Sequence, residues 1–410
     1  MKNFIYQYSI FVVKNPLKIL FSVLIVVLIA LQGITNFKLD ASSDALVLEG
    51  DESLKKYREN EKEFGDSSFL IVTFKPQYEL FSDQSLNQLS QIEKELSELD
   101  GVDSVLSLLD APIFFQPKVG LTEVADNLKD LTSDGIDFIQ AKKEIINNPI
   151  YRDLIISKDG STTAMQIVLQ GNNEYDALIS DRYKILDILK SKEPITFEDK
   201  TKLQSELTTI NKRISELNDN ESAFNATLVS QIRSILDLHR SNATLYLGGP
   251  AMITSDMMEY IRSDLVTFGI AVASIFAIML YLFFGNIKFV IFPISNAFLT
   301  TFVTAGFLGY MDWKISVVSS NFIALLLILT ISLTVHVLVK INELSLESED
   351  NKKSLIDAVE QMFLPCFFAA FTTAVAFLSL LLGDLKPVIE FGKMMAFGIS
   401  IAFIFTFSFL

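Results

Sequence analysis

PLKILFSVLIVVLIALQGITN, residues 16–36, is an apolar segment that contains one charged side chain, Lys18. About 20 apolar residues in a helix cross the ~30 Å hydrocarbon core of a bilayer, so we expect a transmembrane helix over 17–36. A basic flank before an apolar run is also typical of a cleaved secretory signal. The apolar run exceeds the ~7–15 residues of such a signal and no A-x-A site follows it, which favours a retained helix.

Five further apolar segments follow, and all of them lie after residue 263. The sequence predicts transmembrane helices at 264–284, 287–310, 316–339, 363–383 and 388–410. The links between them are short, except for the charged segment 340–362, where we expect a loop with an amphipathic helix. The predicted fold is therefore six membrane helices, with a large polar insert, 37–263, between the first and the second.

The composition agrees with a membrane protein. Of 410 residues, 50% are hydrophobic, 34 are Phe, and the mean hydropathy is +0.38, which is too apolar for an ordinary soluble enzyme. The net charge of −15 lies in the insert, because residues 39–263 have 23 basic and 39 acidic side chains. Such a region repels phosphates, which argues against a nucleic-acid partner. The single cysteine, Cys366, allows no disulfide within the chain.

The distribution of lysine and arginine predicts the orientation, since both favour short cytoplasmic segments. We take residues 1–16 to lie in the cytoplasm. The inner segments then carry seven basic residues: Lys2, Lys14, Lys18, Lys288, Lys340, Lys352 and Lys353. The outer ends carry five: Lys38, Arg262, Lys314, Lys386 and Lys393. The bias is small. It agrees with an insert on the periplasmic or extracellular side of the inner (plasma) membrane, with 340–362 in the cytoplasm.

The insert alternates strand and helix patterns. A strand at 67–74, an amphipathic helix at 82–99 and a strand at 101–108 form a strand–helix–strand unit. A hairpin around Asp159 and Gly160 follows, and a long charged helix over 201–241 precedes the last strand, ATLYLGG. Strand, helix, strand, strand, helix, strand is the ferredoxin-like order. The pattern thus predicts an α+β domain, either ferredoxin-like or of another α+β topology.

Three longer stretches resemble the resistance-nodulation-division (RND) permeases, in the branch with MMPL, Patched-like and hopanoid-exporter proteins. KLDASSDALVLEGDESLKKYRENEKEFG (38–65) is similar to the family's first outer segment. LGGPAMITSDMMEYIRSDL (247–265) is similar to its approach to the second span, and LPCFFAAFTTAVAFLSLLLGDLKPVIEFGKMMAFGI (364–399) to its fifth and sixth spans. The order and spacing of the three stretches match the family along the whole chain.

The resemblance implies the N-terminal half of an exporter that is driven by an ion gradient and moves apolar or lipid-like substrates through a porter-type outer domain. Such permeases have two halves, so a second half is expected as partner, in the same longer chain or in another subunit of an oligomer. The apolar end at Leu410 favours a fragment of a longer protein. The alternative is a membrane sensor of the sterol-sensing-domain type, or an accessory subunit of a secretion or transport complex.

Polar side chains interrupt the fourth apolar segment, LLLILTISLTVHVLVKINEL at 325–344. Many proton-coupled relatives have an aspartate where the resemblance aligns Ser332, and a serine cannot replace it as a proton carrier. At 100° per residue, Ser332 and His336 share one face, whereas Thr330 and Thr334 lie about opposite. The Ser332–His336 face is expected either to face the bundle centre, with His336 taking up protons, or to hold ordinary helix contacts. Oxygen ligands for Na⁺ are a third possibility.

Other residues of the apolar segments and their ends are candidate ion ligands or structural groups. Thr372 and Thr373 are candidate ion-coupling residues, although packing is the simpler interpretation. Gly392 and Gly398 are predicted helix-packing positions. Asp264 is interpreted as a helix N-cap. Three more residues are assigned surface roles: Tyr310 and Trp313 as interfacial anchors and His239 as a residue of the charged helix without a metal.

Motifs of enzymes are missing from the sequence. It contains no Gly-rich phosphate loop, no G-x-S-x-G motif and no cluster of His or Cys. We therefore expect no enzyme, no cofactor and no metal centre, and a transporter without a nucleotide site must use an ion gradient.

Overall fold

The computed structural model of the chain describes residues 2–39, 56, 69–116, 128–190, 196–347, 350–383 and 385–409. The chain divides into two compact units, one formed by Met1–Lys55 with Met257–Leu410 and the other by Lys56–Asp256. The first is called the membrane unit below and the second the sheet domain. The segment 38–65, which resembles the first outer segment of the RND permeases, lies almost entirely outside the described residues.

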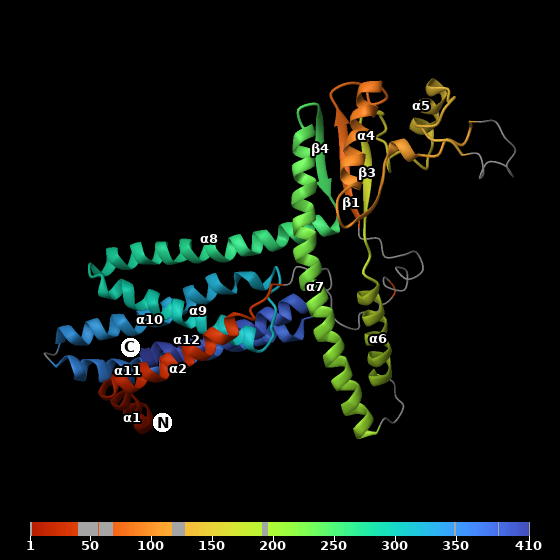
Figure 1. The fold of residues 1–410 in the computed structure, drawn as a ribbon. Helices are drawn as coiled ribbons and strands as arrows, with labels where there is room; N and C mark the ends of the chain where they lie inside the picture. Colours follow the sequence, from red (N-terminus) through yellow and green to blue (C-terminus); the bar gives the residue numbers. More distant parts are fainter. Residues whose placement is uncertain are drawn as a thin grey trace. The chain divides into compact units, whose positions relative to one another are not determined.

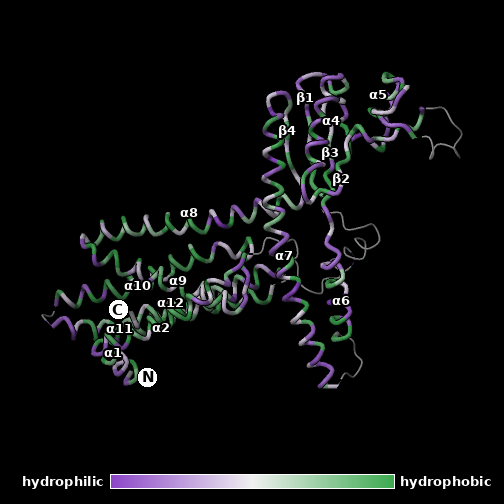
Figure 2. Tube along the Cα trace, in the orientation of Figure 1, coloured by the Kyte–Doolittle hydropathy of each residue, from purple (hydrophilic) through white to green (hydrophobic). Residues whose placement is uncertain are grey.

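The membrane unit is helical over most of its described residues (Figure 1). Its helices are α1 (Lys2–Lys14), α2 (Pro16–Ile34), α8 (Pro250–Phe284), α9 (Lys288–Tyr310), α10 (Phe322–Glu347), α11 (Asn351–Leu378) and α12 (Lys386–Phe409), with 3-10 turns at η3 (Ser319–Asn321) and η4 (Ser379–Leu382). Among the described residues, six helical segments are apolar and long enough to cross a membrane. Figure 2 shows the hydrophobic colouring that these helices share. The prediction of a multi-pass membrane protein with six apolar helices is confirmed.

Three helices form the interior of the membrane unit. In the most apolar window of each span, 56% of the residues are buried in α9, 50% in α10 and 44% in α12, against 11–17% in α2, α8 and α11. The outer three helices expose apolar side chains, as lipid contact requires. Polar side chains that avoid lipid must then lie among α9, α10 and α12.

Glycines bring α2 and α9 into backbone contact. A Cβ added at Gly33 would overlap the carbonyl oxygen of Gly306, and one added at Gly306 would overlap that of Ala30. Gly309 lies equally close to the carbonyl of Gly33. The first and third spans therefore pack through small residues spaced one turn apart, which lets helices approach closely in a bilayer.

In its described residues, the sheet domain has four strands: β1 (Phe69–Pro76), β2 (Val102–Leu106), β3 (Thr163–Leu169) and β4 (Ala243–Gly248). All pairings are antiparallel, in the order β2-β3-β1-β4. Because β1 and β2 are both antiparallel to β3, they run parallel to each other, joined by α4 (Asp83–Ser97). Parallel strands need such a crossover, and the predicted strand–helix–strand unit is confirmed.

One face of this sheet is covered by α4 and by the second half of α7 (Phe197–His239). The alternating buried residues of β1, which are Leu70, Val72 and Phe74, meet Leu89, Ile92 and Leu96 of α4 and Leu228, Ile232 and Leu236 of α7. Every one of these side chains is at most 2% exposed. The apolar residues that alternate along the strand and those that repeat every 3.6 residues along the helices therefore form one core.

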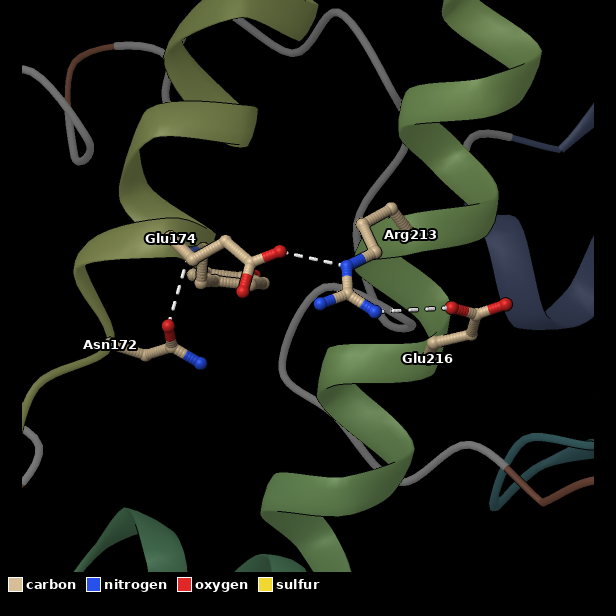
Figure 3. Close-up of polar contacts among 5 residues, drawn as sticks. Asn172, Glu174, Arg213 and Glu216 are labelled. Atoms are coloured by element: carbon tan, nitrogen blue, oxygen red, sulfur yellow. Dashed lines mark hydrogen bonds and ion pairs between the residues drawn. The ribbon is translucent and has the colours of Figure 1, made fainter.

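The first half of α7 pairs with a helix that the sequence did not predict, α6 (Asn173–Lys190). Ile179 and Ile185 of α6 and Ile214 of α7 are buried. Arg213 Nε donates to Glu174 Oε1 at 2.7 Å, and its terminal nitrogen lies 3.4 Å from Glu216 Oε2 (Figure 3). The guanidinium lowers the pKa of the Glu174 carboxyl through this hydrogen bond. All three side chains are exposed, so this contact adds little to stability. Its main effect is to align α6 along α7.

Several boundaries differ from the sequence-based expectations. The segment 340–362 is not a loop with a separate helix, because α10 continues to Glu347 and α11 begins at Asn351. Asp264 is not an N-cap, since α8 begins at Pro250 and Asp264 lies inside it. Residues 2–14 form α1, and α5 (Phe138–Asn147) was also not expected. The expected turn at Asp159 and Gly160 is present, with a single antiparallel bridge before β3.

Replacing Gly306 by alanine should destabilise the membrane unit by about 1–3 kcal/mol, because the new methyl group must push α2 away from α9. Gly269 of α8 is the matched control, since a Cβ there meets its nearest atom at 4.0 Å, and Gly269→Ala should be neutral or slightly stabilising. Thermal unfolding in detergent, followed through the fluorescence of the only tryptophan, Trp313, compares the two. Equal midpoints for both variants would contradict the close contact.

Candidate functional site

A group of uncharged polar side chains lies in the interior of the membrane unit. Asn296 and Thr300 come from α9, Thr330 and Thr334 from α10, and Thr406 from α12. Each of the five is 0% exposed. These five residues are called the buried polar cluster below. Asn296 and Thr300 are four residues apart, as are Thr330 and Thr334, so each pair occupies one face of its helix.

Hydrogen bonds join three helices in this cluster. The Asn296 side-chain amide donates to Thr334 Oγ1 at 2.8 Å and to Thr406 Oγ1 at 3.2 Å. The two threonine hydroxyls lie 3.3 Å apart, and Thr334 Oγ1 donates back to the carbonyl oxygen of Thr330 at 2.8 Å. Polar contacts of this kind hold membrane helices together where lipid offers no partner.

Three oxygens of the cluster have no hydrogen-bond partner among the described residues. They are Asn296 Oδ1, Thr300 Oγ1 and Thr330 Oγ1. A buried polar atom without a partner costs about 1–3 kcal/mol, and most buried polar atoms in folded proteins are paired. Such unpaired oxygens, concentrated in one place, mark the interior of α9, α10 and α12 as the candidate functional site.

The predicted Ser332–His336 face does not lie in this interior. Both residues are exposed on the surface of the membrane unit, whereas Thr330 and Thr334 are fully buried. Within the six described helices, Ser332 and His336 therefore do not face the interior formed by α9, α10 and α12, and their role as ion-coupling residues stays a prediction. The helical geometry had separated the two faces correctly, but it could not tell which of them is buried.

The remaining predicted site residues show helix contacts. Thr372 is exposed and donates to the carbonyls of Phe368 and Ala369, and Thr373 donates to that of Ala369. A Cβ at Gly392 would lie 2.5 Å from the Phe377 carbonyl oxygen, and one at Gly398 would lie 3.1 Å from Leu326. Tyr310 is exposed and Trp313 half-buried.

Sequence reasoning missed Asn296, Thr300 and Thr406. The signal was present in FPISNAFLTT, where an asparagine and a threonine four residues apart interrupt the apolar segment at 287–310. The described ranges contain no group of three or more His, Cys, Asp or Glu side chains that could hold a metal ion.

The sheet domain has its own polar contacts along α4. His239 Nε2 lies 2.9 Å from Glu95 Oε2, and hydrogen bonding to the imidazole lowers the pKa of that carboxyl. Glu93, two residues before Glu95 in the same helix, is half-buried and accepts from Ser107 Oγ at 2.6 Å. Burial raises the Glu93 pKa, the Ser107 hydrogen bond lowers it, and the charge of Asp110 adds to the rise.

The raised pKa of Glu93 gives stability a defined pH dependence. A carboxyl whose pKa is higher in the folded state than the ordinary 4.5 favours folding when protonated, and this contribution is lost as pH rises through the folded-state pKa. Glu93→Gln, which stays neutral, should therefore stabilise the sheet domain at pH 7 by less than about 1 kcal/mol after solvent screening. The gain should vanish near pH 4.

Hydrogen–deuterium exchange of peptides from α4 and β2 in the full chain measures this difference. Glu98→Gln, at the exposed C-cap position that follows the same helix, is the control and should leave the exchange unchanged. A Glu93→Gln chain that is less protected than the wild type at pH 7 would show that the carboxylate is stabilising.

Thr334→Val should destabilise the membrane unit by about 1–3 kcal/mol, because it removes the hydroxyl that accepts from Asn296. Ser332→Ala, two residues away and exposed, should change stability by no more than about 0.5 kcal/mol. Both are measured by the Trp313 fluorescence of thermal unfolding. A larger loss of stability in Ser332→Ala than in Thr334→Val would show that the Ser332 face of α10 is the buried one.

Comparison with known families places these elements in context. Residues 215–410 match the family model described as the MMPL family. The matched segment includes the second half of α7, β4, helices α8–α12 and all five residues of the buried polar cluster. A comparison with curated proteins finds no match. This match, together with the six apolar helices, supports membership of the RND/MMPL superfamily of membrane transporters.

Proposed function

We propose that the chain is the N-terminal half of an RND-type exporter, driven by an ion gradient, that moves apolar or lipid-like substrates through its sheet domain. The observation that carries this proposal is the MMPL match over residues 215–410, which coincides with five of the six apolar helices. A transporter without a nucleotide site needs an ion gradient for uphill transport.

The sheet domain is proposed as a porter-type domain with ferredoxin-like topology, on the periplasmic side of the inner membrane. Its sheet order, β2-β3-β1-β4, supports the topology, because the crossover helices α4 and α7 lie against one face. The acidic excess of residues 39–263 is compatible with this side, since long domains cross the membrane regardless of charge.

The exposed Ser332–His336 face is proposed as part of the surface that meets the second half of the transporter. Ser332 and His336 are polar and exposed on a helix that is otherwise half-buried in its span. Polar groups in a membrane span normally face protein or water, since hydrocarbon offers them no hydrogen bond. A second six-helix half, in the same longer chain or in another subunit, would supply that partner.

A second candidate function is a membrane sensor of the sterol-sensing type, or an accessory subunit. One observation favours it: residues 322–339 of α10 contain no Asp or Glu, so the carboxylate relay of many proton-coupled relatives is missing from this span. Without a substitute for that relay, the helices could bind lipid without transporting it.

Transport in reconstituted vesicles separates the two functions. The full chain is incorporated into vesicles that contain an NBD-labelled lysophospholipid, and a Na⁺ or proton gradient is imposed. Dithionite, which quenches only the outer leaflet, then reports redistribution of the probe. We expect redistribution that depends on the gradient and stops when an ionophore dissipates it.

Two variants and one negative control complete the experiment. Ser332→Ala and His336→Ala should slow the redistribution if this face contacts the second half, whereas protein-free vesicles should show none. A folded chain that redistributes no probe under either gradient would overturn the transporter proposal and favour the sensor or accessory function. Unchanged rates in both variants would remove this face from the mechanism.

A further inference from the structure

The buried polar cluster is arranged in levels across α9, α10 and α12. Asn296, Thr334 and Thr406 form one level through the contacts of 2.8, 3.2 and 3.3 Å already given. Consecutive spans run in opposite directions, so α9, the third span, is antiparallel to α10 and α12, the fourth and sixth. One helical turn, about four residues, toward higher numbers on α9 therefore corresponds to four residues toward lower numbers on α10 and α12. The next level is then Thr300, Thr330 and Ala402.

A contact one level further supports this register. Four more residues along each helix lead to Thr304, Leu326 and Gly398. A Cβ added at Gly398 would lie 3.1 Å from the Leu326 side chain and 3.4 Å from Thr304 Cγ2, as the register requires. Ala402, at the middle level, is fully buried and has only a methyl group. At this level, α12 therefore offers Thr300 and Thr330 a methyl group and no hydrogen-bonding side chain.

The unpaired oxygens fall on the first two levels. Asn296 Oδ1 belongs to the first, and Thr300 Oγ1 and Thr330 Oγ1 belong to the second. A half-turn of the Asn296 amide exchanges its oxygen and nitrogen, and would place the amide oxygen against the Thr334 and Thr406 hydroxyls. Either orientation leaves amide and hydroxyl oxygens from three helices within one helical turn of each other.

The chemistry of these oxygens restricts the ligand. Amide and hydroxyl oxygens are hard donors, which suit alkali and alkaline-earth cations and not transition metals. None of the five side chains titrates near neutral pH, so the cluster cannot carry a proton. A divalent cation normally takes carboxylate ligands, and the five residues include none. A monovalent cation with neutral oxygen ligands fits best, as in sites built from carbonyl oxygens in channels.

We propose that the buried polar cluster binds Na⁺ through oxygens of Asn296, Thr300, Thr330, Thr334 and Thr406. With the Asn296 amide in its half-turned orientation, Thr334, which donates its proton to the Thr330 carbonyl, keeps the lone pairs of its hydroxyl for the ion. Without a carboxylate the affinity is weak, on the order of 1 mM or weaker. The coupling of this ion to transport rests on the proposed function, whereas its binding does not.

Binding is tested on the purified full chain in lipid nanodiscs. Thermal unfolding, followed by Trp313 fluorescence, is measured in NaCl, KCl and N-methylglucamine chloride at equal ionic strength, which holds charge screening constant. Na⁺ should raise the unfolding midpoint in a saturable way, because a ligand of the folded state stabilises it by mass action. Binding of ²²Na⁺ in a scintillation proximity assay gives the apparent affinity directly.

Variants identify the ligands. Thr330→Val and Thr406→Val keep the side-chain shape and should weaken the apparent Na⁺ affinity by about tenfold or more. Thr330→Ser keeps the hydroxyl and should retain binding, which separates ligand loss from altered packing. Thr372→Val is the matched control, because that hydroxyl is exposed and bonds only its own helix.

The outcomes distinguish this inference from the proposed function. A shift of equal size in NaCl and KCl, or Na⁺ binding that persists in both valine variants, would overturn the site and leave the unpaired oxygens to water. Na⁺ binding without gradient-driven redistribution of the NBD lipid would support the site and contradict transport. Redistribution without Na⁺ binding would support transport and overturn the site.

Discussion

The membrane unit depends on one constraint: hydrocarbon provides no hydrogen-bond partner, so every polar side chain in a span must find one in the protein. Helices α9, α10 and α12 satisfy this constraint for the amide nitrogen of Asn296 by placing threonines around it. The amide contacts hydroxyls of two other helices at 2.8 and 3.2 Å. In water the same contacts would compete with solvent, but here they are the alternative to an unpaired amide. The burial of these three helices follows from that requirement.

Close backbone contact between α2 and α9 depends on a different property, the absence of side chains at Gly33, Gly306 and Gly309. Lipid-facing helices gain little from a hydrophobic effect when they associate, because acyl chains are as apolar as leucine. The association of these helices therefore depends on van der Waals contact between closely packed backbones. Helix α9 thus has two different surfaces, a glycine surface toward α2 and a polar surface toward α10 and α12.

The sequence predicted elements whose pattern is local, and it failed where the answer depends on neighbours. Six apolar helices could be predicted because length and hydropathy decide whether a segment spans a bilayer. The core helices α4 and α7 were predicted from the spacing of Leu89, Ile92 and Leu96 and of Leu228, Ile232 and Leu236. By contrast, the periodicity of α10 separated Thr330 and Thr334 from Ser332 and His336 without showing which pair is buried. Helix packing decides that, and a single sequence does not contain it.

The polar cluster also explains why a neutral site in a span can matter for conformational change. Its oxygens come from three helices, so any ligand that contacts all of them favours the one arrangement in which the helices converge. A ligand shifts an equilibrium only by its difference in affinity between the two states. If α9 moved by a fraction of a turn, Asn296 would leave Thr334 and Thr406, and the proposed Na⁺ site would lose ligands from at least one helix. Occupancy of the site and the position of α9 are therefore linked, without any residue that changes its charge.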